Sequence, residues 1–221
     1  MKKAAFFDID GTILDHENYI PQSTVDGIHK LQKSGNYAFL CTGRSRAYVR
    51  NPALLEIGFD GIISGCGTMV ELHGEVLFYK KLEHSLVKDT VAFLKGQHSA
   101  VIMEGRYRLY ADPEDFEGDL YLAKLREELG EYLLPLTGSE ADWEASKFSC
   151  TTQGVDMECC RQYLSKDYEL LIHDIPVMEV VPKGFSKATG IQKICEILGI
   201  PHEDTYSFGD STNDLDMLEY T

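Results

Sequence analysis

Two carboxylates, Asp8 and Asp10, stand two residues apart directly after a short apolar run, and Gly11 follows them as a turn residue. Three more polar side chains occupy comparable positions: Thr42 and Asp210 each follow an apolar run, and Lys187 begins a helical pattern. Carboxylates gathered at one place repel one another unless a cation lies between them, and an all-oxygen set favours Mg²⁺. Hydroxyl and ammonium donors suit a phosphate. These residue types indicate phosphoryl transfer.

The two carboxylates are suited to different roles in that reaction. The ordinary pKa of an aspartate is about 3.9, so Asp8 is ionised at neutral pH and needs no base to act as a nucleophile. A metal ion and Lys187 would offset its repulsion from an anionic substrate. Asp10 would protonate the leaving oxygen and then activate water, a role typically worth about 10²- to 10⁴-fold. Thr42 and the backbone of Gly43 would bind the phosphate, together with the helix N-terminus behind Lys187.

The elements that position these residues can be read from the apolar pattern. Residues 3–7 and 37–42 form near-continuous apolar runs typical of buried parallel strands, and 59–67 indicates a third, shorter strand. Residues 23–34 between the first two runs have helical spacing, with a stop at Gly35. The carboxyl ends of parallel strands share one edge of a sheet, where ligands bind. Residues that are distant in sequence can therefore meet there.

The pattern of apolar and polar residues changes twice along the chain. From 83 to 180 the strand-like segments alternate apolar and polar residues, which is typical of sheets with one exposed face. After 180 the pattern of buried parallel strands and helices returns. Ser186 is placed to cap a helix that stops at Gly199, and a last strand ends at Asp210. The predicted organisation is an α/β core, 1–82 and 181–221, interrupted by an α+β domain at 83–180.

Composition excludes several classes of protein. The chain of 221 residues has a formal net charge of −15 and a pI near 4.8, which disfavours nucleic acid as a partner. It has no segment with the apolar length of a membrane span, and no signal-peptide core near its N-terminus. Its six cysteines form no CxxC pair and are expected to be reduced and mostly buried. We expect a cytoplasmic protein that binds neither nucleic acid nor membrane.

Four motifs in order carry a resemblance to a known family. They are DIDGT at 8–12, CTGR at 41–44, GFSKATG at 184–190 and GDSTND at 209–214. The sequence resembles the haloacid dehalogenase-like superfamily of phosphohydrolases, and within it the Cof-like branch with a large α/β (type IIB) cap. The resemblance implies a Rossmann-like parallel-sheet core with an inserted cap, which closes over the crevice and selects the substrate.

The resemblance also implies roles for individual residues. A phosphoaspartyl intermediate would form on Asp8. Three groups would hold Mg²⁺: the Asp8 side chain, the Asp10 backbone carbonyl and Asp210. Asn213 would help to bind phosphate, while Asp214 would orient Lys187 or support the metal shell. The presence of Asp10 indicates phosphotransfer rather than dehalogenation.

The implied activity is Mg²⁺-dependent hydrolysis of small phosphomonoesters, such as sugar phosphates or phosphorylated cofactors. Two alternatives stay open: a phosphomutase, and a catalytically silent binding or regulatory protein on the same scaffold. The chain departs from the family at Cys66 and Gly67, where relatives often have Asn and Gly, and it ends at Thr221, before the strand and helix that usually follow. The second part of the core is therefore expected to be truncated. Arg44 and Arg46 follow Thr42 closely enough to meet the substrate, but arginines at a helix start are more commonly solvated, and this is the expectation. The oligomeric state is not predicted.

Overall fold

The structure, a computed structural model of the chain, describes residues 2–15, 17–116, 120–173 and 175–221. It divides into two compact units. The core unit comprises Met1–Arg44, Arg50–Tyr79 and Gly184–Thr221. The inserted unit comprises Ser45–Val49 and Lys80–Lys183. The confirmed fold class is α/β with a sheet in each unit, whereas the domain boundaries expected from sequence stay a prediction.

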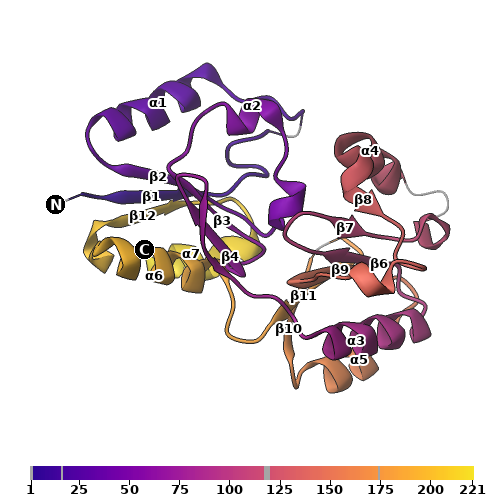
Figure 1. Cartoon of the computed structure of the whole chain (residues 1–221). Helices are drawn as coiled ribbons and strands as arrows, with labels where there is room; N and C mark the ends of the chain where they lie inside the picture. The colour runs from indigo at the N-terminus through magenta and orange to yellow at the C-terminus, as the bar shows by residue number, and fades with distance from the viewer. Residues whose placement is uncertain (1, 16, 117–119, 174) are drawn as a thin grey trace. The chain divides into compact units, whose positions relative to one another are not determined.

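The core unit is built on a six-stranded sheet in the order β12-β1-β2-β3-β4-β5 (Figure 1). Four strands run parallel: β1 (Ala4–Phe7), β2 (Tyr37–Cys41), β3 (Gly61–Ser64) and β12 (Thr205–Phe208). The other two, β4 (Met69–Leu72) and β5 (Glu75–Tyr79), pair antiparallel. The predicted parallel order therefore holds for β1, β2, β3 and β12.

The antiparallel hairpin of β4 and β5 is an element that the sequence patterns did not predict. Its strands are joined by His73 and Gly74, whose φ angles are +49° and +81°. A two-residue turn with both central residues at positive φ has the twist that antiparallel strands need. A parallel connection would require a crossover of a dozen or more residues, for which this stretch is too short. The edge of the sheet is therefore formed by a local hairpin.

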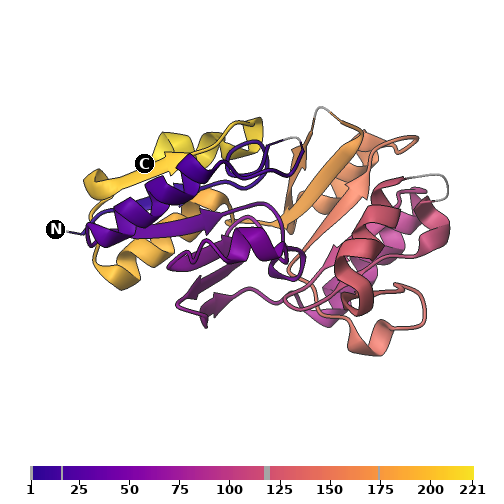
Figure 2. The same ribbon diagram turned by 90° about the horizontal axis from the view of Figure 1, so that it is seen from above.

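Helices cover both faces of the core sheet. The helix α1 (Gln22–Lys33) follows β1, and α2 (Pro52–Leu55) follows β2. On the opposite face from α1, α6 (Lys187–Leu198) and α7 (Leu215–Tyr220) lie side by side (Figure 1, Figure 2). Phe6 and Phe39 stack with ring centroids 5.3 Å apart, and they are fully buried in the same cluster as Ile191 and Ile194 of α6. This apolar contact sets the position of α6 on the sheet.

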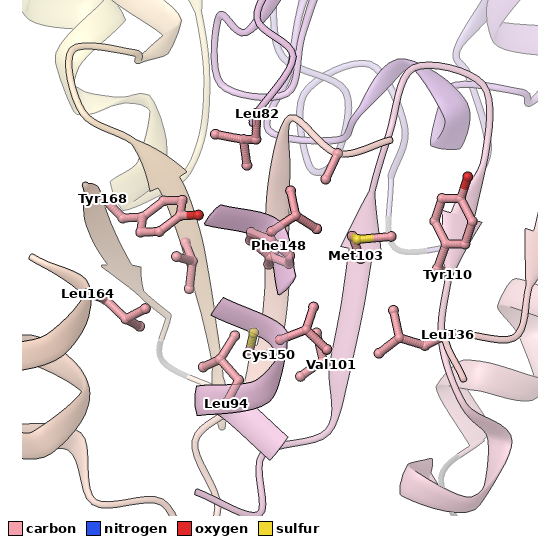
Figure 3. Close-up of a cluster of buried hydrophobic side chains, with 14 of the residues drawn as sticks. Leu82, Leu94, Val101, Met103, Tyr110, Leu136, Phe148, Cys150, Leu164 and Tyr168 are labelled. Atoms are coloured by element: carbon pink, nitrogen blue, oxygen red, sulfur yellow. The ribbon is translucent and has the colours of Figure 1, made fainter. Parts of the chain in front are cut away.

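The inserted unit has its own six-stranded sheet, in the order β10-β11-β9-β6-β7-β8. Its strands are β6 (Val101–Glu104), β7 (Leu109–Tyr110), β8 (Leu133–Leu134), β9 (Lys147–Thr151), β10 (Tyr168–Ile172) and β11 (Val177–Pro182). Its helices are α3 (His84–Gly96), α4 (Leu120–Leu129) and α5 (Met157–Leu164). Figure 3 shows the core of this unit, in which Phe148, Met103 and Tyr168 of the strands lie with Leu94 of α3 and Leu164 of α5. Every second strand residue faces this core.

Candidate active site

The site forms where the strand order of the core sheet reverses. β1 lies between β2, which follows it through α1, and β12, which enters through α6. The Asp8 N–H donates to the Phe208 carbonyl at 2.9 Å, so the loops after β1 and β12 begin at the same edge. Ligands bind in α/β proteins at such switch points, beyond the carboxyl ends of the strands. Asp8 follows β1, and Asp210 follows β12 by two residues.

The Lys187 ammonium contacts Asp8 near the N-terminus and Asn213 and Asp214 near the C-terminus. Its ammonium lies 2.7 Å from Asp8 Oδ1, is paired with Asp214, and donates to Asn213 Oδ1 at 3.3 Å. Lys187 is the first residue of α6 and is only 2% exposed. Ser186 caps that helix: its Oγ accepts from the Thr189 N–H while the Thr189 hydroxyl accepts from the Ser186 N–H. The cap fixes where the helix begins and thereby where Lys187 points.

Asp214 organises the loop that carries Asp210. One oxygen of Asp214 accepts the backbone N–H groups of Asp210 and Ser211, each at 3.1 Å, and the other is paired with Lys187. The Asp214 residue is fully buried, whereas Asp210 is exposed. Because both oxygens of Asp214 are already engaged, its geometry suits support of Lys187 and of the loop better than direct metal ligation.

The carboxylates of the site fit a divalent cation. Asp8, Asp210 and Asp214 each offer an oxygen, and these oxygens lie within 4.8 Å of one another. The Lys187 ammonium pairs with Asp8 and Asp214, and within the described residues no ion pair reaches Asp210. An all-oxygen set of this charge matches Mg²⁺, a hard ion that prefers carboxylates and keeps part of its water shell.

The pKa values of Asp8 and Lys187 reflect the crowding of carboxylates around one ammonium group. Burial raises the pKa of Asp8 to about 6, and the charge of Asp214 adds to the rise, although Lys187 opposes it. Burial works against the charged form of Lys187, yet its carboxylate neighbours, led by Asp8, outweigh burial and raise its pKa. One ammonium thus keeps its proton but does not fully stabilise the Asp8 carboxylate.

The predicted phosphate ligands Thr42 and Gly43 follow β2 at the same edge of the sheet. Thr42 is buried; its N–H donates to the Ile63 carbonyl at 2.9 Å, and its Oγ1 accepts the Arg44 N–H at 3.1 Å. Since β2 pairs with β1 in parallel, with Leu40 opposite Phe7, the chain after β2 lies beside the chain after β1. The structure therefore brings both predicted loops to one edge.

Asp10 has a partner that sequence reasoning missed. The Arg44 guanidinium donates from Nε to Asp10 Oδ2 at 2.8 Å and from Nη2 to Oδ1 at 2.6 Å. The expectation of a solvated Arg44 is wrong, because its side chain is 19% exposed, against 56% for Asp10. The position of Arg44 in the sequence could have indicated this pair, because Arg44 follows Thr42 and Gly43 at the strand edge where Asp10 also lies.

Gly11 turns the chain directly after Asp10, with φ at +80°. A Cβ built at this position would overlap the carboxylate of Asp210. We therefore expect Gly11→Ala to displace Asp210 and to weaken Mg²⁺ binding by about tenfold or more, because both the backbone conformation and the close approach exclude a side chain. Isothermal titration with Mg²⁺ checks this. Gly27→Ala on α1, where a Cβ meets nothing within 4 Å, is the matched control. Equal affinities in the two variants would contradict the expectation.

Comparison with known proteins identifies the family. A family profile described as haloacid dehalogenase-like hydrolase matches residues 5–221. The chain belongs to this family. YkrA of Bacillus subtilis (strain 168), named as a candidate phosphatase, is 32% identical over 223 residues, which cover 99% of this chain and 83% of YkrA. The resemblance seen in the four motifs is thereby confirmed.

Other relatives of this hydrolase carry more specific names. The 5-amino-6-(5-phospho-D-ribitylamino)uracil phosphatase YitU of Bacillus subtilis is 27% identical over 96% of this chain and 82% of YitU. An HMP-PP phosphatase of Yersinia pseudotuberculosis is 27% identical over 99% of this chain and 81% of the relative. The expectation that the chain is a phosphatase of this family is confirmed.

Solved structures agree on the fold. A hypothetical protein from Geobacillus kaustophilus HTA426 is 26% identical, with a TM-score of 0.81 over 100% of this hydrolase and 84% of that chain. A sugar phosphatase of subclass IIB, BT4131, is 24% identical, with a TM-score of 0.80 over 99% of this chain and 85% of its own. The predicted α/β fold is confirmed. Within the described ranges, no helix combines the length and apolar character that crossing a membrane requires.

Proposed function

We propose that the protein is a Mg²⁺-dependent phosphohydrolase that cleaves small phosphomonoesters through a phosphoaspartyl intermediate on Asp8. The observation that carries the proposal is the cluster at the switch point, in which the Asp8 carboxylate lies 2.7 Å from the buried Lys187 ammonium and within one oxygen cluster with Asp210 and Asp214. These groups would supply a nucleophile, a counter-charge and ligands for a cation at one sheet edge.

In the first step, an oxygen of Asp8 attacks phosphorus while the bond from phosphorus to the leaving oxygen breaks. Asp10, protonated for this step, gives its proton to the leaving oxygen. In the second step, Asp10 takes a proton from water as that water attacks phosphorus, and the Asp8 carboxylate is released. Because Asp10 is both acid and base, each turnover returns it to its starting protonation state.

The remaining residues bind and orient. Asp8, the Asp10 carbonyl and Asp210 would hold Mg²⁺, which when bound supplies positive charge that offsets the repulsion between carboxylates and phosphate. Asp214 would keep Lys187 in place. Lys187 would neutralise the nucleophile and the phosphate oxygens during transfer, and its place at the start of α6 adds the partial positive charge of the helix N-terminus.

Thr42, Gly43 and Asn213 would bind the phosphate oxygens, and the substrate is a small phosphorylated metabolite. The names of YitU and the HMP-PP phosphatase refer to small phosphorylated compounds, which supports this class. The 15 excess negative charges of the chain disfavour a polyanionic partner such as nucleic acid. The cytoplasmic location stays a prediction.

The test is phosphate release from p-nitrophenyl phosphate and from a panel of phosphorylated metabolites, with Mg²⁺ and with EDTA. We expect release with Mg²⁺ and a return to background with EDTA that added Mg²⁺ reverses. Release that is unaffected by EDTA would contradict the metal requirement. Isomerised hexose phosphate without free phosphate would favour the mutase, and no turnover across the panel by folded protein would favour a silent binding protein.

Mg²⁺ binding is expected to depend on pH through Asp8. Since burial raises the pKa of Asp8 to about 6, protons compete with the metal below that pH and Asp8 is ionised above it. We expect Mg²⁺ affinity to be about tenfold higher at about pH 7.5 than at about pH 5. Thermal unfolding across a Mg²⁺ titration measures this, because a ligand of the native state raises the melting temperature. Ca²⁺-free buffers and the Asp8→Asn variant, in which that titration is absent, are the controls; equal affinity at both pH values in the wild type would contradict the assignment.

A further inference from the structure

Two successive residues, Arg44 and Ser45, make hydrogen bonds with different units of the protein. The Arg44 side chain binds Asp10 in the core unit, and the Ser45 N–H donates to Glu104 Oε2 of the inserted unit at 3.1 Å. We propose that Arg44 is a positioning residue for Asp10, and that Glu104 of the inserted unit anchors the backbone that carries Arg44. The inference rests on the proposed function, in which Asp10 is the acid and base.

The contact between Arg44 and Asp10 is suited to positioning. A guanidinium that donates two parallel hydrogen bonds to a carboxylate fixes the plane of that carboxylate, which a single contact does not. In the described part of the chain, the Asp10 carboxylate accepts no other side-chain hydrogen bond. It is also the more exposed partner, so solvent competes for it. Arg44 is therefore what orders the carboxylate.

The backbone of Arg44 is held on the core side. Its N–H donates to Thr42 Oγ1 at 3.1 Å, and its carbonyl accepts the Gly65 N–H at 2.7 Å. Thr42 is a predicted phosphate ligand, so the group that orders Asp10 is built into the phosphate loop. The next peptide group is where the chain passes to the inserted unit, which begins at Ser45.

Glu104 holds that next peptide group from within a buried charged cluster. Glu104 is 3% exposed, and its other oxygen accepts the Ser149 hydroxyl at 2.6 Å. The Lys147 ammonium lies 3.4 Å from Glu104 and is paired with Glu179 as well. Among the described residues the buried hydroxyl of Ser45 has no hydrogen-bond partner, so the backbone N–H is the group of Ser45 that the anchor uses.

The cluster is a costly way to stabilise a sheet. Desolvation of three charged side chains opposes folding, and apolar residues of similar volume commonly do as well or better. What a buried carboxylate supplies, and an apolar side chain does not, is a fixed acceptor of a hydrogen bond. In this protein that acceptor holds Ser45, one peptide bond from the residue that orders Asp10.

Kinetics separates positioning from substrate binding. We expect Arg44→Met to lower kcat by about 10²-fold, because both chemical steps use Asp10, with little change in KM. Arg44→Lys is expected to rescue part of the loss, since an ammonium keeps the charge but not the two-point contact. Arg126→Met, on an exposed face of α4, is the matched control and should leave kcat unchanged. A wild-type kcat in Arg44→Met, or a rise in KM that accounts for the whole loss, would overturn the inference.

The anchor is tested with Ser45→Pro and Ser45→Ala. The φ of Ser45 is −63°, which proline adopts, so Ser45→Pro removes the N–H at a φ that the ring accepts, whereas Ser45→Ala keeps the N–H. We expect kcat to fall about tenfold in Ser45→Pro relative to Ser45→Ala, because loss of the anchor displaces Arg44 slightly from Asp10. Equal kcat values in the two variants would overturn the anchor. If Ser45→Pro does not fold, Glu104→Leu replaces it, because Lys147 then still has Glu179 as its counter-charge.

A second readout needs neither substrate nor metal. The nitrogen-15 resonance of the Arg44 Nε–Hε group, assigned by its loss in Arg44→Met, should be protected from solvent exchange in the wild type and in Ser45→Ala. It should exchange faster in Asp10→Asn and in Ser45→Pro. Fast exchange in the wild type would overturn the inference even in an active enzyme. If the wild type hydrolyses no phosphomonoester, the proposed function fails, while this spectrum still decides whether Arg44 holds Asp10.

Discussion

Asp8→Asn is expected to reduce phosphate release from p-nitrophenyl phosphate by on the order of 10⁴-fold or more, because the amide has the shape of the carboxylate but is not a nucleophile. The fold should survive. In the metal-free protein the pKa of Asp8 is raised to about 6, so the folded state binds the proton more tightly than the unfolded state does. Ionised Asp8 therefore costs stability as the pH rises through 6, and the neutral amide does not.

The measurement has two parts. Steady-state kinetics with Mg²⁺ gives the loss of turnover, and urea unfolding in EDTA gives the free energy of unfolding at about pH 5 and about pH 7.5. We expect the metal-free variant to be at least as stable as the wild type at the higher pH. Asp89→Asn, an exposed position on α3, is the control for the change from carboxylate to amide. Turnover in folded Asp8→Asn comparable to that of the wild type would exclude Asp8 as the nucleophile.

Lys187→Met is expected to remove activity and also to destabilise the core unit strongly. The ammonium is 2% exposed and lies between Asp8 and Asp214, so its loss leaves buried carboxylates without their counter-charge. Breaking a buried ion pair in this way typically costs about 3–5 kcal/mol. Without the ammonium, which opposes the rise in the pKa of Asp8, Asp8 should bind a proton more readily, so the destabilisation should shrink as the pH falls from about 7.5 to about 5.

Urea unfolding in EDTA measures this free energy, and Lys88→Met, an exposed lysine on α3, is the control for removal of an ammonium. Added Mg²⁺ should restore part of the lost stability of Lys187→Met, because it brings positive charge to the same carboxylates. A Lys187→Met protein as stable as the wild type at about pH 7.5 would show that Lys187 does not compensate these charges. Turnover retained in Lys187→Met would show that Lys187 is not required for phosphoryl transfer.

Several parts of the site could be predicted because they depend on local pattern and on one topological rule. The apolar run before Asp8 and the helix start at Lys187 are visible in the sequence, and the capping pattern at Ser186 with the stop at Gly199 marks that helix correctly. Parallel strands end at one edge, so the groups that follow them converge. The contact of 2.7 Å between Asp8 and Lys187, 179 residues apart, follows from these two facts.

Other parts depend on side-chain direction and strand pairing, which spacing does not encode. The apolar content of β4 and β5 is as compatible with parallel as with antiparallel pairing, and the short turn at His73 and Gly74 decides it. Arg44 binds Asp10 only because the chain after β2 bends so that the guanidinium reaches the neighbouring loop. No residue pattern around Arg44 specifies that bend.

The sequence by itself determined the α/β class, the order of the four motifs and which side chains are chemically able to transfer a phosphoryl group, since these follow from residue type, periodicity and strand-end geometry. The tertiary structure alone decided how the charges are partnered. Asp214 is paired with Lys187 and with the Asp210 loop, and Glu104 accepts from Ser45. These contacts join distant segments, so they depend on the distances between strands and helices that the packed cores fix.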